Sequence, residues 1–143
     1  MKIEKYAIEN YDEIIKLWRK VDLTITSSDS KEEVERMLQL NPDLFLIGKI
    51  DEKIIGVVMG GFDGRRGYVH HLAIEPKYQK KGFGKMLVDE LMKKFREKKV
   101  HKVHLFIEKR NNDVITFYQK LGWEMRNDLV MMSIIPDPEY YQP

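Results

Sequence analysis

The order of hydrophobic and polar positions along the chain predicts four helices and seven strands. Apolar residues recur at helical spacing after Asn10, after Ser30, from Gly82 to about Lys98, and from Asp113 to Leu121. Asn10 and Ser30 are the predicted N-caps of the first two helices, and Gly122 is the predicted C-terminal cap of the last. Short apolar runs bounded by turn residues predict strands. The predicted strands cover residues 2–8, 44–50, 54–60, 68–74, 103–107, 123–125 and 129–135.

These elements follow one another as β-α-α-β-β-β-α-β-α-β-β. Short turns such as Asp51–Lys53 predict antiparallel hairpins, whereas the strand–helix–strand unit around the Gly82 helix predicts one parallel pair. The expected fold class is therefore α/β, with a central mixed sheet flanked by helices. We expect residues 1–135 to form a single domain and residues 136–143 a C-terminal tail.

The composition narrows the class of protein. A chain of 143 residues fits one domain. It has no cysteine, which excludes disulfides and thiolate chemistry, and no apolar run near the roughly 20 residues that span a bilayer. The first residues lack the apolar core of a secretion signal. We expect a cytoplasmic protein with no membrane partner.

Basic residues concentrate in one stretch of a chain whose remaining residues are acidic overall. Ten basic and three acidic residues lie between Lys77 and Lys102, although the net charge of the chain is only +2. This asymmetry indicates an anionic partner near the stretch. For residues 93–99 a solvated helix face is the simpler interpretation. RNA binding is disfavoured, because no stacking aromatics alternate with these lysines.

Glycines interrupt the charges in the segment Gln79-Lys80-Lys81-Gly82-Phe83-Gly84, between a predicted strand and a predicted helix. Backbone N–H groups at a helix start bind anions, and glycines allow a close approach. A Walker A loop would need Ser or Thr where Met86 stands, and a dinucleotide fingerprint would need glycine in place of Leu87. The alternative is an ordinary turn with two glycines.

The segment Gln79–Gly84 resembles the Arg/Gln-x-x-Gly-x-Gly/Ala signature of the Gcn5-related N-acetyltransferase (GNAT) superfamily. Residues 72–76 resemble the strand that precedes this signature, and residues 111–123 resemble the Asn…Phe-Tyr-x-x-x-Gly-aromatic element that follows it. Residues 17–23 and 59–67 are similar to a bacterial branch that contains ribosomal-protein alanine acetyltransferases and YpeA-type proteins.

The resemblance implies acetyl-CoA as the cofactor and no metal. The pyrophosphate would bind the loop and the start of its helix, and the pantetheine arm would lie along the strand at Leu72–Ile74, where a backbone N–H near Leu72–Ala73 would polarise the thioester carbonyl. The implied cofactor-binding residues are Leu72, Ala73, Ile74, Gln79, Lys80, Lys81, Gly82, Phe83, Gly84, Lys85 and Asn111.

The same resemblance assigns the general acid to Tyr118, because a phenol with an ordinary pKa near 10 stays protonated at neutral pH and can protonate the departing thiolate. Related enzymes use a glutamate base, but the matching positions hold Phe106 and Tyr68. His70 matches a histidine of arylalkylamine-type relatives, so it is a candidate base; a packed, neutral side chain is the alternative.

The implied reaction is direct transfer of acetyl from acetyl-CoA to a primary amine in a ternary complex. The acceptor is a protein N-terminus, a lysine or a small amine, which Asp22, Asp63 and Glu108 are placed to attract. The absent glutamate base leaves a catalytically inactive CoA-binding regulatory module as the alternative. The resemblance leaves a homodimer open. Because neighbours on a strand point to opposite faces, we expect that His70 and His71 cannot share a metal ion.

Overall fold

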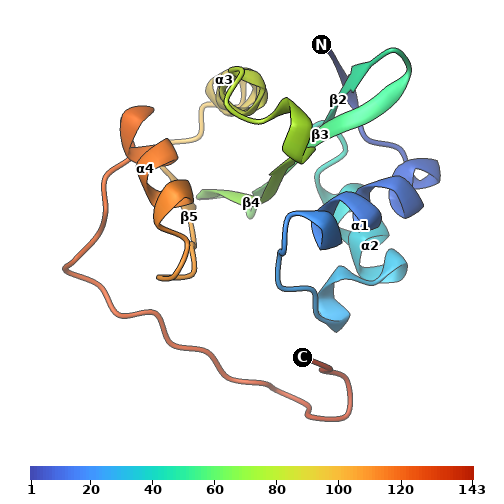
Figure 1. Ribbon diagram of the computed structural model, residues 1–143. Coiled ribbons are helices and arrows are strands. Elements are labelled where there is room, and N and C mark those ends of the chain that lie inside the picture. Colours follow the sequence, from blue (N-terminus) through green and yellow to red (C-terminus); the bar gives the residue numbers. More distant parts are fainter.

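The computed structural model describes all 143 residues, as a five-stranded sheet with helices on both faces (Figure 1). The strands are β1 (Lys2–Lys5), β2 (Phe45–Ile50), β3 (Lys53–Phe62), β4 (Gly67–Ile74) and β5 (Val103–Leu105). The helices are α1 (Tyr11–Lys20), α2 (Lys31–Leu40), α3 (Phe83–Glu97) and α4 (Asn112–Lys120). No helix has the length and apolar character needed to cross a membrane. The predicted α/β class is confirmed.

Short 3₁₀ turns and side-chain caps set where the helices begin. Ser30 accepts a hydrogen bond from the Glu33 amide at 3.3 Å and so caps α2 as predicted. Asn10 precedes α1, but its side chain accepts a hydrogen bond from the Ala7 amide instead of an amide of the helix. The 3₁₀ turns are η1 (Ile8–Asn10), η2 (Ser27–Asp29) and η3 (Pro76–Tyr78).

The strands lie in the sheet in chain order, β1-β2-β3-β4-β5. The first three pairings are antiparallel, and β4 with β5 is parallel. The parallel pair follows from the crossover through α3, as the strand–helix–strand unit predicts. A mixed sheet results, with its only parallel pair at one edge.

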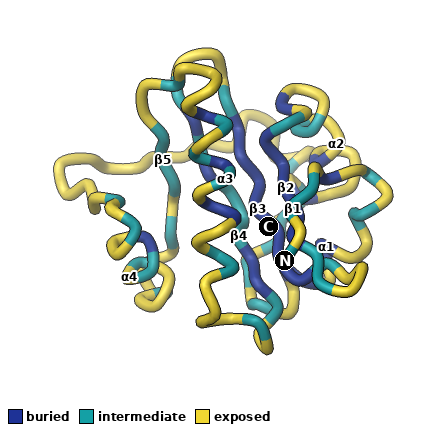
Figure 2. The backbone as a smooth tube through the Cα atoms, turned by 90° about the horizontal axis from the view of Figure 1, so that it is seen from above, coloured by how far each residue is buried: buried dark blue, intermediate teal, exposed yellow.

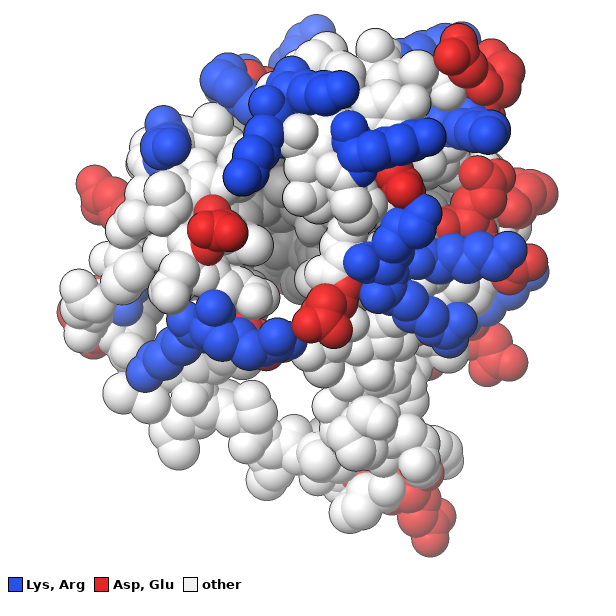
Figure 3. All heavy atoms as spheres, viewed as in Figure 1, with Lys and Arg blue, Asp and Glu red and all other residues white.

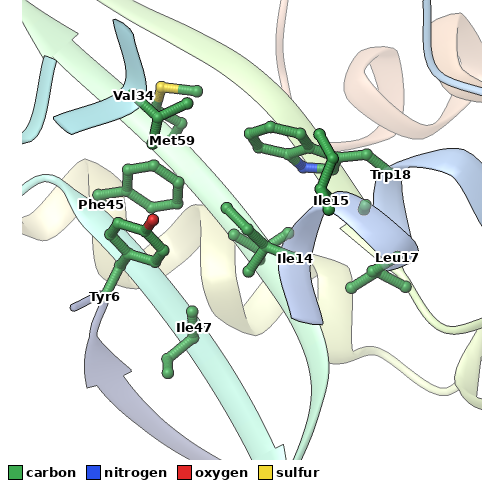
Figure 4. Close-up of a cluster of buried hydrophobic side chains, with 11 residues drawn as sticks. Tyr6, Ile14, Ile15, Leu17, Trp18, Val34, Phe45, Ile47 and Met59 are labelled. Atoms are coloured by element: carbon green, nitrogen blue, oxygen red, sulfur yellow. The ribbon is translucent and has the colours of Figure 1, made fainter. Parts of the chain in front are cut away.

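Two hydrophobic cores cover the two faces of the sheet. Helices α1 and α2 pack on one face, where Trp18 and Val34 meet strand residues such as Phe45 and Val57 (Figure 4). Helix α3 packs on the opposite face, where Leu87 and its neighbours meet other residues of β2 to β4. Figure 2 shows buried positions concentrated along the central strands, while α3 exposes its outer side.

The last predicted hairpin is absent. Residues 124–136 form no strand, and none of them takes part in a backbone–backbone hydrogen bond. Their large apolar side chains face outward; Val130 is 85% exposed and Met132 is 89% exposed. The prediction was wrong because β-propensity describes how well a residue fits a paired, half-buried surface, and here no strand pairs with the segment. The end of the chain instead returns to the α1–α2 connection, where the Ser27 amide donates to the Gln142 carbonyl at 2.8 Å.

Candidate active site

The loop between β4 and α3 is shaped by two residues with left-handed backbone geometry. Lys80 has φ +61° and Gly82 has φ +87°. A β-carbon at Gly82 would meet no atom within 4 Å, so lack of space does not explain the glycine. The left-handed backbone conformation does, because glycine adopts it at no steric cost. The Gln79 side-chain amide donates to the Ile74 carbonyl at 2.9 Å. The loop therefore places the start of α3 beside the last residues of β4.

The first turn of α3 carries amide groups that no side chain caps. The N-cap is Gly82, which has no side chain that could accept a hydrogen bond. The first N–H groups of α3 therefore lie unpaired at the positive end of the helix dipole. Lys81 lies over the Tyr78 ring, 5.8 Å from its centre. Lys85 pairs with Asp89 at 2.6 Å, which offsets part of the charge predicted there. Figure 3 shows a hollow on this face whose rim carries many Lys and Arg side chains and some Asp and Glu side chains. Such a setting suits an anion.

Strands β4 and β5 separate soon after they pair. Their register runs only from Gly67 with Val103 to Val69 with Leu105. Because β4 continues to Ile74, the β5-facing edge of residues 70–74 has no strand partner. Backbone N–H and C=O groups along that edge are available to an extended ligand. The edge includes Leu72, Ala73 and Ile74, the residues predicted to hold a cofactor arm.

A bulge interrupts β4 within this edge. Met59 pairs with His70 and Val57 pairs with Ala73, so one residue of β3 opposes two residues of β4. His71 has φ +38°, which is uncommon for a residue with a β-carbon. The prediction that His70 and His71 point to opposite faces is wrong, because the extra residue shifts the alternation. Both side chains line the same cavity.

Asp29, on the 3₁₀ turn η2, is the hydrogen-bond partner of His71. It is 7% exposed, and its Oδ1 lies 2.7 Å from His71 Nε2. Its Oδ2 accepts a hydrogen bond from the Thr26 amide at 3.0 Å, and the Tyr11 hydroxyl donates to its carbonyl at 2.7 Å. Burial is the largest single influence on the Asp29 pKa and raises it, but the His71 and Thr26 hydrogen bonds and nearby positive charge together lower the pKa below its ordinary value. Asp29 is therefore a carboxylate held against His71.

The cavity that both histidines line has a volume of about 490 Å³ and opens between the α1–α2 connection, α2 and the strands β3 and β4. Its wall combines hydroxyl groups, charged groups and an apolar part. The lining residues are Thr24, Thr26, Ser28, Asp29, Glu33, Val34, Arg36, Met37, Leu40, Met59, His70 and His71.

His70 differs from His71 in its surroundings. Burial, followed by the charge of His71, lowers the pKa of His70, and no hydrogen bond contributes to it. Its ring lies 6.2 Å from that of Tyr68, which is also 6.5 Å from the Phe106 ring. Of the two positions at which the resemblance leads to a glutamate, Tyr68 lies beside His70 and Phe106 lies beside Tyr68. His70 is a neutral imidazole at pH 7.

Tyr118 is the buried residue of α4, 5% exposed. Its ring packs edge-on against Phe117 at 5.0 Å and against Trp123 at 5.4 Å. Burial raises the pKa of the Tyr118 phenol well above its ordinary value, so the hydroxyl stays protonated throughout the neutral range. That protonation state is the one a proton donor needs.

Asn111 is the N-cap of α4 and half-buried, and its carbonyl accepts a hydrogen bond from the Ile115 amide at 3.1 Å. Its side chain makes no cap hydrogen bond, which leaves the amide group open to a ligand. Asn111 lies in the connection between β5 and α4.

The three acidic residues predicted to attract an amine divide into two groups. Arg110 contacts both Glu108, at 2.7 Å, and Asp22, at 3.4 Å, so these carboxylates are already paired. Glu108 also accepts from the Thr24 hydroxyl, which joins the β5–α4 and α1–α2 connections. Asp63 instead accepts backbone hydrogen bonds within the β3–β4 turn. None of the three lines the cavity.

Sequence reasoning missed Asp29 and His71. The pattern Thr26-x-x-Asp29 is a local signal for a capped turn, and that turn forms. The signal does not reveal the contact with His71, which lies 42 residues away in the chain. No group of three or more His, Asp or Glu side chains is placed to hold a metal ion anywhere in the 143 residues.

Comparisons with known proteins agree with this geometry. The model of the acetyltransferase (GNAT) family matches residues 10–123, the part that holds α1 to α4. An acetyltransferase of Sodalis glossinidius is 33% identical over 142 residues, which cover 98% of this chain and 100% of that protein.

Solved structures share the fold. The PaiA N-acetyltransferase of Thermoplasma acidophilum, in complex with coenzyme A, has a TM-score of 0.79 at 22% identity and covers 88% of this chain and 91% of its own. A chain of the NatC complex bound to Gag peptide and CoA has a TM-score of 0.71 at 24% identity, over 85% of this chain and 84% of its own.

Proposed function

The chain belongs to the acetyltransferase (GNAT) family, and we propose that it transfers the acetyl group of acetyl-CoA directly to a primary amine. One observation carries the proposal: the unpaired edge of β4 leads straight into the glycine loop at the start of α3. A ligand with a polar extended arm and an anionic group matches this combination, and coenzyme A has both.

The cofactor would lie with its pyrophosphate on the backbone of Lys80–Lys85 and its pantetheine arm along Leu72–Ile74. The unpaired amides of α3 supply donors for the phosphates, and the free edge of β4 supplies donors and acceptors for the arm. An N–H near Leu72 would polarise the thioester carbonyl. The open side chain of Asn111 would contact the arm from the β5–α4 connection. The relative PaiA, which was solved with coenzyme A, supports this choice of cofactor.

The acceptor amine would enter from the cavity on the α1–α2 side of β4. This cavity reaches β4 at His70 and His71, directly before the strand edge proposed for the cofactor arm. Cofactor and acceptor therefore approach the same residues of β4 from different directions, which favours direct transfer in a ternary complex.

The thiolate that leaves would take its proton from Tyr118. The phenol stays protonated because burial raises its pKa, and Tyr118 contacts Phe117, whose ring faces the glycine loop at Gly84. The proton of the acceptor ammonium would go to a histidine of the cavity, because this chain has Tyr68 and Phe106 at the positions where related enzymes have a glutamate base.

A protein N-terminus, a lysine or a small amine all present the required group. The NatC relative, solved with a Gag peptide, supports a polypeptide among these classes. Two carboxylates lie in the cavity wall, and each already has a partner: Glu33 lies 3.6 Å from Arg36, and Asp29 lies 2.7 Å from His71. Membership of the narrower bacterial branch named above stays a prediction.

Isothermal titration of acetyl-CoA into the purified protein tests the cofactor, with dephospho-CoA and ATP as comparison ligands. We expect saturable one-site binding of acetyl-CoA and none of ATP. A dissociation constant above about 1 mM, weaker than about −4 kcal/mol, would remove the assignment. With binding established, a panel of peptides and small amines tests transfer, and release of free CoA thiol measures its rate.

A further inference from the structure

Two adjacent histidines line the cavity, and only one of them has a fixed partner. His71 Nε2 lies 2.7 Å from Asp29 Oδ1, and its ring lies 4.8 Å from that of the fully buried Trp18. The His71 side chain is 24% exposed, toward the cavity that it lines. The ring is thus oriented by a carboxylate and an indole while one side remains accessible.

The contact with Asp29 determines which ring nitrogen can accept a proton. A carboxylate only accepts hydrogen bonds, so Nε2 must carry the hydrogen that lies between them. In neutral His71 the lone pair is then on Nδ1, which makes no hydrogen bond within the protein. His71 therefore presents a proton acceptor whose tautomer is set by a neighbouring group, the arrangement found in histidine bases of hydrolases.

The surroundings of His70 lack these features. Burial lowers its pKa and no hydrogen bond stabilises its protonated form, so a proton taken up by His70 would lie in an unfavourable site. Protonated His71 would instead pair with the ionised Asp29.

We propose that His71 is the general base that takes the proton of the acceptor ammonium, and that Asp29 is the positioning residue that orients His71 and stabilises its charge. This inference rests on the proposed function. It replaces His70, the candidate base from the sequence, with the next residue, which lies in the bulge.

The proton balance of the step is complete. The acceptor ammonium gives one proton to His71 Nδ1, and the free amine attacks the thioester carbonyl. The carbon–sulfur bond breaks, and the thiolate takes a proton from Tyr118. The nitrogen loses its second proton as the amide forms, and this proton reaches the Tyr118 phenolate through solvent, so that Tyr118 is protonated again. His71 returns its proton to solvent.

The test compares variants in the transfer assay, with acetyl-CoA binding measured on each. His71→Asn should lower kcat about 10²- to 10⁴-fold, the usual contribution of a general base, while the affinity for acetyl-CoA is unchanged. Asn tolerates the positive φ of residue 71, so the bulge is kept. Asp29→Asn keeps an acceptor for Nε2–H but removes the charge, and should lower kcat roughly 10- to 100-fold. His101→Asn, at an exposed histidine outside the cavity, is the matched control and should leave the rate unchanged.

Chemical rescue separates a base from a structural role. His71→Gly accepts the backbone conformation and leaves space for a free imidazole, which should restore part of the rate as its concentration rises. Added imidazole should not restore Asp29→Asn.

Three results decide the matter. Wild-type protein that binds acetyl-CoA and acetylates an amine, with His71→Asn equally active, would overturn the role of His71 alone. A larger loss of kcat in His70→Asn than in His71→Asn would return the role to His70. Wild-type protein that acetylates no amine of the panel would overturn the proposed function, and the base assignment with it.

Discussion

Gly84 in the first turn of α3 faces the aromatic ring of Phe117 on α4. A β-carbon at residue 84 would lie 3.3 Å from that ring, closer than side chains normally approach. Phe117 is followed by Tyr118, so the close contact at residue 84 lies next to the proposed acid in the chain. The second glycine of the signature thus serves helix packing, whereas the first serves backbone conformation.

Enlarging residue 84 should therefore disturb both cofactor binding and α4. Gly84→Ala needs a shift of a few tenths of an ångström and should be tolerated, whereas Gly84→Val should cost about 1–3 kcal/mol of stability through overpacking. Thermal unfolding and acetyl-CoA titration measure the two effects.

The double variant Gly84→Val/Phe117→Ala provides the internal control, because removal of the ring removes the clash. We expect a strongly non-additive cycle in which the double variant is more stable than the sum of the single changes predicts. Additive effects would mean that the Phe117 ring does not limit the size of residue 84.

Gly82 and Gly64 form a matched pair for the effect of backbone conformation. Both have positive φ, +87° and +98°, and at neither position would a β-carbon meet another atom within 4 Å. Alanine at either site should cost about 1–2 kcal/mol of stability, since a left-handed backbone is unfavourable for residues with a β-carbon.

Only Gly82→Ala should also weaken acetyl-CoA binding, because Gly64 lies in the β3–β4 turn away from the loop. Titration and thermal unfolding of both variants give the comparison. Equal affinity for acetyl-CoA in the two variants would argue against the loop as the phosphate site.

Local signals explain what the sequence predicted correctly. Ser30 caps α2 through its own side chain, and Gly122 ends α4 with φ +94°, because both interactions involve residues within a few positions. Short apolar runs bounded by turn residues likewise located the first five strands. The glycine loop was recognisable because its residues are contiguous.

Features that depend on distant pairing could not be predicted. Val69 and Ile74 pack into the same core although five positions separate them, since the bulge between them reverses the alternation of β4. The bulge exists only in the ladder with β3, so periodicity in one strand gives no sign of it. The same shift brings His71 to Asp29. The apolar residues 129–135 show the converse, because a strong strand pattern without a partner forms no strand.

Tyr6 tests how much a buried hydroxyl without a hydrogen-bond partner costs in stability. It is 3% exposed, stacks on Phe45 at 4.0 Å, and its hydroxyl has no hydrogen-bond partner. Tyr6→Phe should raise the free energy of unfolding at pH 7 by about 1 kcal/mol, because an unsatisfied buried hydroxyl costs roughly that amount or more. Chemical denaturation at equilibrium measures the change.

The same variant has a predicted pH dependence. Burial, with smaller contributions from Tyr11 and nearby carboxylates, raises the pKa of Tyr6 above that of the unfolded chain. The free energy of unfolding does not depend on Tyr6 ionisation below about pH 10 and falls as the pH rises further, because only the unfolded state ionises there. Tyr6→Phe should lose less stability than wild type above pH 10, whereas Tyr140→Phe, at a residue 82% exposed, should follow wild type. Parallel curves for all three proteins would contradict the pKa direction.

Tyr118→Phe tests the acid while it preserves the packing. The ring contacts with Phe117 and Trp123 do not involve the hydroxyl, so the variant should fold and bind acetyl-CoA like wild type. Without a proton donor the thiolate must leave unprotonated, and kcat should fall about 10²- to 10⁴-fold. Titration and initial rates with saturating acceptor separate the two effects.

The leaving group provides the decisive control for this variant. A thiol more acidic than coenzyme A can leave as a thiolate without being protonated. With an acetyl thioester of such a thiol, the difference in kcat between wild type and Tyr118→Phe should therefore be smaller than with acetyl-CoA. An acid with the ordinary phenol pKa would ionise near pH 10, and the rate of the enzyme would fall there. Because burial raises the pKa of Tyr118, the rate of wild type should not fall near pH 10 through loss of this proton. A constant ratio of rates for the two thioesters would mean that Tyr118 acts through packing and not as the proton donor.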